Sequence, residues 1–331
     1  MSKVSSKLPL EIATVRRDNL LSALEAVRGC LKTSSMLWMR VLGLPVLSGV
    51  VVFDWSKVSA NAVRRFSRRN RFSKLLLRID KRDQRWTRRR GGYLVTLAEV
   101  PATIKELQHE GMIAALLEPA SPYTDQYSLA GVTAPDQEKL IIEIVGPGFD
   151  ASDILRGDIQ AHERWEATLE PAMLPAKSAE PLFCRRTNLA SGDQYKLTVR
   201  KRLAKIGARL KNPAYPDTVL QDTTADSDRL AADGMAFLRA THQATLLKHA
   251  ETYVSIPESH VMAFARDVRK LISGLSAYGI HLGPSSFAAS VIPKRGLVFW
   301  DFFPARKHEA TSLYPCEETY SALGNAASLQ R

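Results

Sequence analysis

Arginine and glycine residues in one segment have the types and spacing that bind phosphate. Arg78 ends an apolar run, and Arg88-Arg89-Arg90 leads directly into Gly91 and Gly92. Guanidinium groups bind phosphate oxygens in a bidentate manner, and glycines let backbone N–H groups approach an anion closely. The pattern predicts a cradle for nucleotide phosphates, with Arg78 and Arg90 as charged contacts.

The same segment also allows two other interpretations. Between Arg64 and Arg90 there are thirteen Arg or Lys residues against two Asp, while the whole chain has a formal net charge of +12. Phe66, Phe72 and Trp86 are interleaved with these charges, a pattern typical of proteins that stack on single-stranded nucleic acid. A non-enzymatic nucleic-acid-binding protein is therefore one alternative. A solvated basic face without a ligand is the other.

Two acidic positions suit a divalent cation. Glu143 lies in the strand-like run 139–145 before Gly146-Pro147-Gly148, and Asp301 lies within the apolar run Leu297–Pro304. Carboxylate oxygens are ligands that Mg²⁺ prefers, and a buried carboxylate needs a partner. Helix capping by Asp150 or Ser152, and a salt bridge from Asp301 to a nearby basic residue, are the structural alternatives.

Several common motifs are absent from the sequence. It contains no Walker A, GxGxxG, GxSxG or HExxH pattern. The three cysteines, Cys30, Cys184 and Cys316, are far apart, which predicts reduced thiols in the cytoplasm. No apolar run reaches the roughly 20 residues of a membrane helix, and no secretory signal opens the sequence. We therefore expect a soluble, cytoplasmic protein.

The elements that position these residues follow from hydrophobic periodicity. The 331 residues predict two lobes rather than one domain. Helical patterns cover 18–32, 59–71, 101–110, 229–249 and 258–278. Strand patterns cover 49–53, 72–79, 93–97, 112–117, 139–145, and a hairpin of 287–292 with 297–302 that turns at 293–296. Together they predict a mixed α/β protein of the α+β type, with an N-terminal lobe over 1–117 and a C-terminal lobe over 118–331 that includes a helical insertion at 160–284.

The order of these features resembles the ATP-grasp superfamily, especially the ATP-binding domain of pyruvate phosphate dikinase and phosphoenolpyruvate synthase. The resemblance covers roughly residues 36–150 and 285–306 of the sequence. The matching segments are Gly43-Leu44-Pro45-Val46, Leu75-Leu76-Leu77-Arg78, Arg90-Gly91-Gly92, Leu116-Leu117-Glu118-Pro119, Tyr127-Ser128-Leu129 and Asp301. One departure is that Phe302 and Phe303 follow Asp301, where the family has Glu, one residue and Asn.

The resemblance implies Mg-ATP bound between two lobes and used for ligation or phosphotransfer. Arg78 and Arg90 would then hold phosphates, with Gly91 and Gly92 closing over them. The nucleoside would contact Glu118. Asp301 and Glu143 would coordinate Mg²⁺. A degenerate ATP-grasp fold acting as an assembly subunit is a further alternative, in which Arg64–Arg71 docks an acidic protein or a nucleic acid.

Overall fold

The chain divides into two compact units. The computed structural model describes residues 8–81, 93–119, 127–133, 139–146, 151, 161–169, 184–188 and 254–304. The first unit contains the described residues of 8–37 and 47–119, and the second contains 38–46 and those from 127 onward. The short segment 38–46 thus belongs with the C-terminal part of the chain. The expected division into two lobes had placed it in the N-terminal one.

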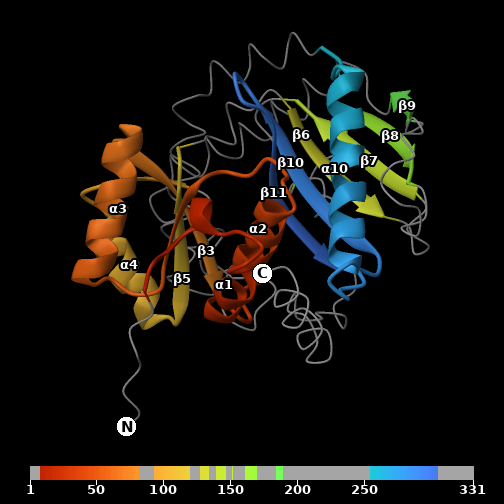
Figure 1. Cartoon of the computed structure of the whole chain (residues 1–331). Coiled ribbons are helices and arrows are strands. Elements are labelled where there is room, and N and C mark those ends of the chain that lie inside the picture. Colours follow the sequence, from red (N-terminus) through yellow and green to blue (C-terminus); the bar gives the residue numbers. More distant parts are fainter. Residues whose placement is uncertain are drawn as a thin grey trace. The chain divides into compact units, whose positions relative to one another are not determined.

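A five-stranded antiparallel sheet forms the centre of the first unit. Its strand order is β1 (Leu10–Glu11), β2 (Gly49–Val52), β5 (Met112–Leu117), β3 (Lys74–Lys81) and β4 (Tyr93–Thr96). Alternate residues of β3 pack into a core with two helices, α3 (Lys57–Asn70) and α4 (Val100–His109). Figure 1 shows both helices beside β5. The opposite side chains of β3 therefore point away from this core.

The N-terminal residues contain two α-helices where the sequence predicted one. The structure has η1 (Ile12–Thr14), α1 (Leu20–Ala26) and α2 (Leu31–Val41). The predicted helix over 18–32 is therefore interrupted, because Gly29 adopts a φ of 82° and breaks the helical conformation. The division between the two units falls inside α2, after Leu37.

The second unit contains a six-stranded antiparallel sheet. Its order is β11 (Gly296–Pro304), β10 (Ser285–Ile292), β6 (Tyr127–Thr133), β7 (Lys139–Val145), β8 (Glu163–Thr168) and β9 (Cys184–Asn188). Helix α10 (Glu258–Ser276) lies across one face of it (Figure 1). Phe264 of α10 stacks on Phe299 of β11 with ring centroids 5.2 Å apart. The core of this unit therefore lies between α10 and that face.

Segment 38–46 is anchored to the second unit by polar and aromatic contacts. The Phe299 amide donates to the Pro45 carbonyl over 2.8 Å, and Lys270 Nζ donates to the Gly43 carbonyl over 3.1 Å. The Trp38 and Tyr278 rings meet edge to face, with centroids 4.9 Å apart. The Gly-Leu-Pro-Val motif therefore packs against α10 and β11.

The fold agrees with the predicted class and hairpin, but it contains strands within the range that was expected to be helical. The α+β class is confirmed, as is the hairpin, because Ile292 pairs with Gly296 across the β10–β11 turn. The range expected to be helical, 160–284, contains α10 but also strands β8 and β9. β8 alternates buried and exposed residues along its length, which is the period-two signal of a strand. The helix predicted over 229–249 lies outside the described residues.

Within the ranges that the structure describes, no helix combines the length and the apolar character needed to cross a membrane.

Candidate functional site

Arg78 lies on the side of β3 that faces away from the α3–α4 core. It pairs with Ala115 of β5, and its side chain shares a sheet face with Leu76 and Asp80. Only 8% of Arg78 is exposed. A guanidinium group in this position is largely desolvated and needs negative charge or acceptors nearby.

Asp80 supplies negative charge on that face. Its Oδ2 accepts hydrogen bonds from the Thr33 amide at 2.8 Å and the Thr33 hydroxyl at 3.0 Å, and 2% of the residue is exposed. Burial raises the pKa of Asp80, while the hydrogen bonds from Thr33 and the charges of Lys32 and Arg78 oppose that rise. The charge of Arg78 therefore partly offsets the effect of burial on the Asp80 carboxylate.

Sequence reasoning did not assign a role to Asp80. The signal that singled out Asp301, a carboxylate within an apolar strand, is also present at Asp80 after Leu75-Leu76-Leu77. Thr33 carried no local signal, since it is 47 residues away in the chain.

Glu118 extends the pairing of β2 with β5 by one residue. Its amide donates to the Ser48 carbonyl at 2.9 Å, and its Oε1 accepts from the Ser48 amide at 3.0 Å. The side chain thus takes the place of a backbone acceptor beyond the Gly49–Leu117 pair. This contact fixes the orientation of the Glu118 carboxylate at the end of β5.

Asp301 and Glu143 lie in one row of the second sheet. Asp301 pairs with Ala288, Ala288 with Ala130, and Ala130 with Glu143. Residues paired across neighbouring strands point to the same face. This is the face opposite α10, because Gly131, the next residue on β6, lies under Phe264 of that helix. Two carboxylates therefore flank two alanines on one sheet surface.

A β-bulge sets the direction of Asp301. Phe299 pairs with Ala289 and Asp301 with Ala288, so Trp300 is the extra residue of the bulge. Strict alternation after Phe299 would turn Asp301 toward α10, and the bulge turns it to the opposite face. Trp300 is fixed by a hydrogen bond from its Nε1 to Ser290 Oγ at 2.8 Å.

The separation of the two carboxylates limits how they can bind a metal ion. Three strand spacings of about 4.8 Å place their backbones about 14 Å apart. Direct Mg²⁺–oxygen bonds are about 2 Å long, so one ion cannot take both side chains as direct ligands. In addition, no group of three or more His, Cys, Asp or Glu within the described ranges is arranged to hold a metal. If Asp301 and Glu143 bind metal directly, each must therefore bind a different ion.

Glu143 also has a basic neighbour. Its partner in the register with β8 is Arg164, which lies on the same face and is exposed. Opposite charges that face each other across two antiparallel strands stabilise the pairing. The pairing therefore places a positive charge beside Glu143 in the acidic row.

The remaining predicted site residues lie outside the described part of the chain. These are Arg90, Gly91 and Gly92 of the glycine loop, together with Arg88. Asp150 and Ser152, the residues of the capping alternative, also lie outside it. Their roles stay predictions.

No protein-family model matches the chain, and no curated protein matches it either. Among solved structures, the chain is similar to D-alanyl-alanine synthetase A from Vibrio cholerae, at 9% identity and a TM-score of 0.39, over 92% of this chain and 66% of that one. It is similar to macrocyclase MdnC from Microcystis aeruginosa, bound with precursor peptide MdnA, at 10% identity and a TM-score of 0.35, over 89% and 59% of the chains. It is also similar to the ATP-grasp ligase PsnB, complexed with a minimal precursor, at 9% identity and a TM-score of 0.31, over 91% and 62%.

The chain thus spans between 59% and 66% of the length of these three structures. One of them bears the name of the superfamily that the sequence motifs resemble, and none bears the name of the dikinase group.

Proposed function

We propose that this protein binds Mg-ATP and uses it for ligation or phosphotransfer. The observation that carries the proposal is the row Asp301–Ala288–Ala130–Glu143 on the face of the second sheet opposite α10. The two residues between the carboxylates, Ala288 and Ala130, carry only methyl side chains. This chemistry suits a cation and the phosphates that it binds.

The donor type at Asp301 fits Mg²⁺. This ion keeps several waters and is usually held by one or two carboxylates together with substrate phosphates. Asp301 would supply the protein ligand, and Glu143, opposite Arg164, would act through water or hold a second ion. When bound, Mg²⁺ neutralises negative charge on the phosphates.

In the first unit, the residues proposed to contact the nucleotide are those that the sequence predicts. Arg78 would contact phosphate through the tip of its guanidinium group. Its positive charge would also continue to lower the pKa of Asp80. Arg90, Gly91 and Gly92 keep the phosphate-loop role that the sequence predicts. Glu118, oriented by Ser48, would accept hydrogen bonds from the nucleoside. The work of these residues is positioning and charge neutralisation, the two main sources of rate enhancement in phosphoryl transfer.

A thermal-shift series tests this proposal. The full chain is heated with Mg-ATP, with Mg-ADP, with Mg²⁺ alone and without ligand. A ligand at 100 times its Kd stabilises the folded state by about 2.7 kcal/mol, so Mg-ATP is expected to raise the Tm. No shift with Mg-ATP in a folded sample would refute nucleotide binding.

Matched variants locate the binding residues. Asp301→Asn removes the charge in the acidic row and is expected to lose most of the Mg-ATP shift. Glu166→Gln removes an exposed carboxylate of the same sheet that pairs with Lys139 instead, and it is expected to keep the shift. Equal Tm shifts for both variants would argue against a role of the acidic row in Mg-ATP binding. Binding without ATP turnover would favour the assembly-subunit alternative over an enzyme.

A further inference from the structure

Helix α3 presents a continuous basic face. Arg64, Arg68 and Arg71 follow one another at helical spacing, and Arg65 and Arg69 lie beside them. All five arginines are exposed, and so is Lys57 at the start of the helix. The helix Lys57–Asn70 contains no acidic residue. At 1.5 Å per residue, the arginines from Arg64 to Arg71 extend over about 10 Å along the helix axis.

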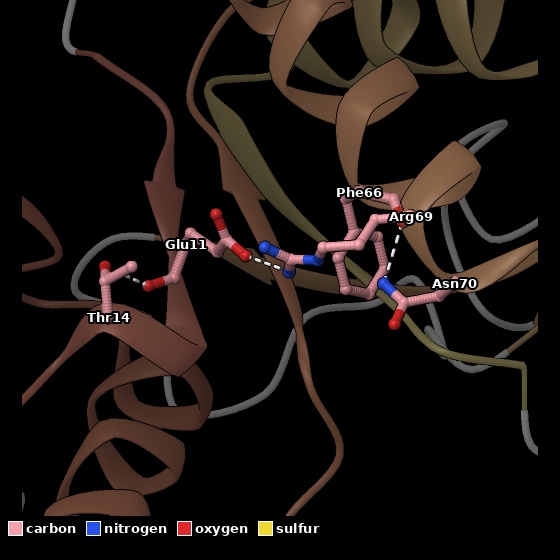
Figure 2. A network of polar contacts seen from close by, with 5 residues as sticks. All are labelled: Glu11, Thr14, Phe66, Arg69 and Asn70. Carbon is pink, nitrogen blue, oxygen red and sulfur yellow. Dashed lines mark hydrogen bonds and ion pairs between the residues drawn. The ribbon is translucent and has the colours of Figure 1, made fainter.

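The opposite side of α3 holds the helix firmly in the first unit. Val63 and Phe66 are 2% exposed and pack into the core. Ser56 caps the N-terminus by accepting a hydrogen bond from the Ser59 amide. At the C-terminus, Asn70 Nδ2 donates to the Phe66 carbonyl at 2.8 Å (Figure 2), and the left-handed Arg71 ends the helix. The backbone that carries the arginines is therefore fixed at both ends.

Most of the charge on this face is uncompensated. Figure 2 shows the one ion pair formed by these arginines among the described residues, between Arg69 and Glu11. The side chains of Arg64, Arg65, Arg68 and Arg71 make no ion pair within the described ranges. Like charges four residues apart, as in Arg64 and Arg68, destabilise a helix. A role in folding alone therefore does not account for this arrangement.

We infer that this face of α3 docks the phosphodiester backbone of a nucleic acid. Arginine binds phosphate in a bidentate manner, and interfaces with nucleic acid are more polar and far more positively charged than those with proteins. Val58 is the one exposed large apolar residue in the described helix. A protein partner would require an apolar interface core, and a membrane surface would require an apolar helix face.

This inference does not depend on the proposed function, because it concerns another surface and another ligand. Its test measures the fluorescence anisotropy of a labelled single-stranded RNA of about 20 nucleotides, and of its duplex, with the full chain. Each phosphate contact with a single strand contributes about −0.7 to the slope of log K against log salt. We expect wild-type affinity to fall steeply between about 50 and 200 mM salt.

The decisive variant is Arg64→Gln/Arg68→Gln. It is expected to lower affinity about 10-fold or more and to reduce the single-strand slope by about 1.4. The control Arg40→Gln/Arg266→Gln removes the same charge from exposed positions of the second unit and is expected to change both values far less. Circular dichroism checks that each variant is folded.

Three outcomes would overturn the inference. One is the absence of binding to either RNA at low salt. Another is an α3 variant that binds as tightly as the control, which would assign any binding to other basic residues. The third is an oligoglutamate peptide that binds α3 more tightly than RNA does, which would assign the face to an acidic protein. Tighter binding of the single strand or of the duplex identifies the preferred form of the backbone.

Discussion

The Asp80 carboxylate binds the start of helix α2 through Thr33. Its Oδ2 accepts from both the amide and the hydroxyl of Thr33, at 2.8 and 3.0 Å, in a position where Asp80 is 2% exposed. The first amides of a helix have no partner within the helix and carry partial positive charge. A side chain from strand β3 thus satisfies donors at the start of α2.

We predict that Asp80→Ala lowers the free energy of unfolding by about 3 kcal/mol, because it leaves the buried Thr33 donors without their acceptor and removes a negative charge near Arg78. Thr33→Val removes only the hydroxyl bond and is expected to cost about 1 kcal/mol. Urea denaturation measures both values. Asp18→Ala, at an exposed carboxylate, is the control. Similar losses for Asp18 and Asp80 would contradict the structural role of Asp80.

The stability of the fold should depend on the protonation of His162. Burial lowers the pKa of His162 to about 4 from 6.5, although the charge of Glu163 acts to raise it. As pH falls below 6.5, the unfolded chain takes up a proton that the folded chain does not, so stability decreases. The stability associated with a neutral His162 is fully present above pH 6.5 and is lost progressively between pH 6.5 and 4.

Denaturant titrations across this window measure the effect. A His162→Gln variant is expected to lose less stability than wild type between pH 7 and pH 4, the latter near the pKa of about 4. His281→Gln, at an exposed histidine, should follow the wild-type curve. Parallel curves for wild type and His162→Gln would exclude His162 as the source.

Gly131 allows α10 to pack closely on β6. A Cβ atom at this position would lie 2.7 Å from Phe264 Cε1 and 3.2 Å from Leu140 Cδ1. Gly131→Ala is therefore expected to destabilise the protein by about 1–3 kcal/mol, although alanine is normally the better strand residue. Phe264→Leu should recover part of that loss in the double variant. A double-mutant cycle without coupling between the two sites would show that this contact is not the cause.

The bulge at Trp300 predicts an asymmetry between two single-residue deletions. Removing Trp300 leaves every β10–β11 pair in place, so this variant is expected to fold, with a modest loss of stability from the missing Trp300–Ser290 contact. Val298 pairs with Ser290. Removing it shifts the register of the β11 residues on one side of the deletion relative to β10, so core side chains there turn to the opposite face. This variant is expected not to fold. Near-ultraviolet circular dichroism and thermal unfolding distinguish the two results. If both deletion variants fold, or if neither does, the assignment of Trp300 as the bulge residue is contradicted.

Local sequence patterns determined several elements of this protein. Strand β5 at 112–117 and strand β7 at 139–145 were predicted with the bounds that the structure has. Helix α3 was predicted within two residues of its ends. Apolar periodicity, helix caps and turn residues act between near neighbours in the chain, which is why these features are readable from the sequence alone.

The tertiary structure alone decided how the chemically active residues are arranged. The sequence identified Asp301, but its direction depends on a bulge defined by pairing with β10. Asp301 and Glu143 share a row only because β10 and β6 lie between their strands. Asp80 gains its partner from a helix 47 residues away. Strand register and contacts between distant elements are set by the packing of the whole unit, so no local pattern encodes them.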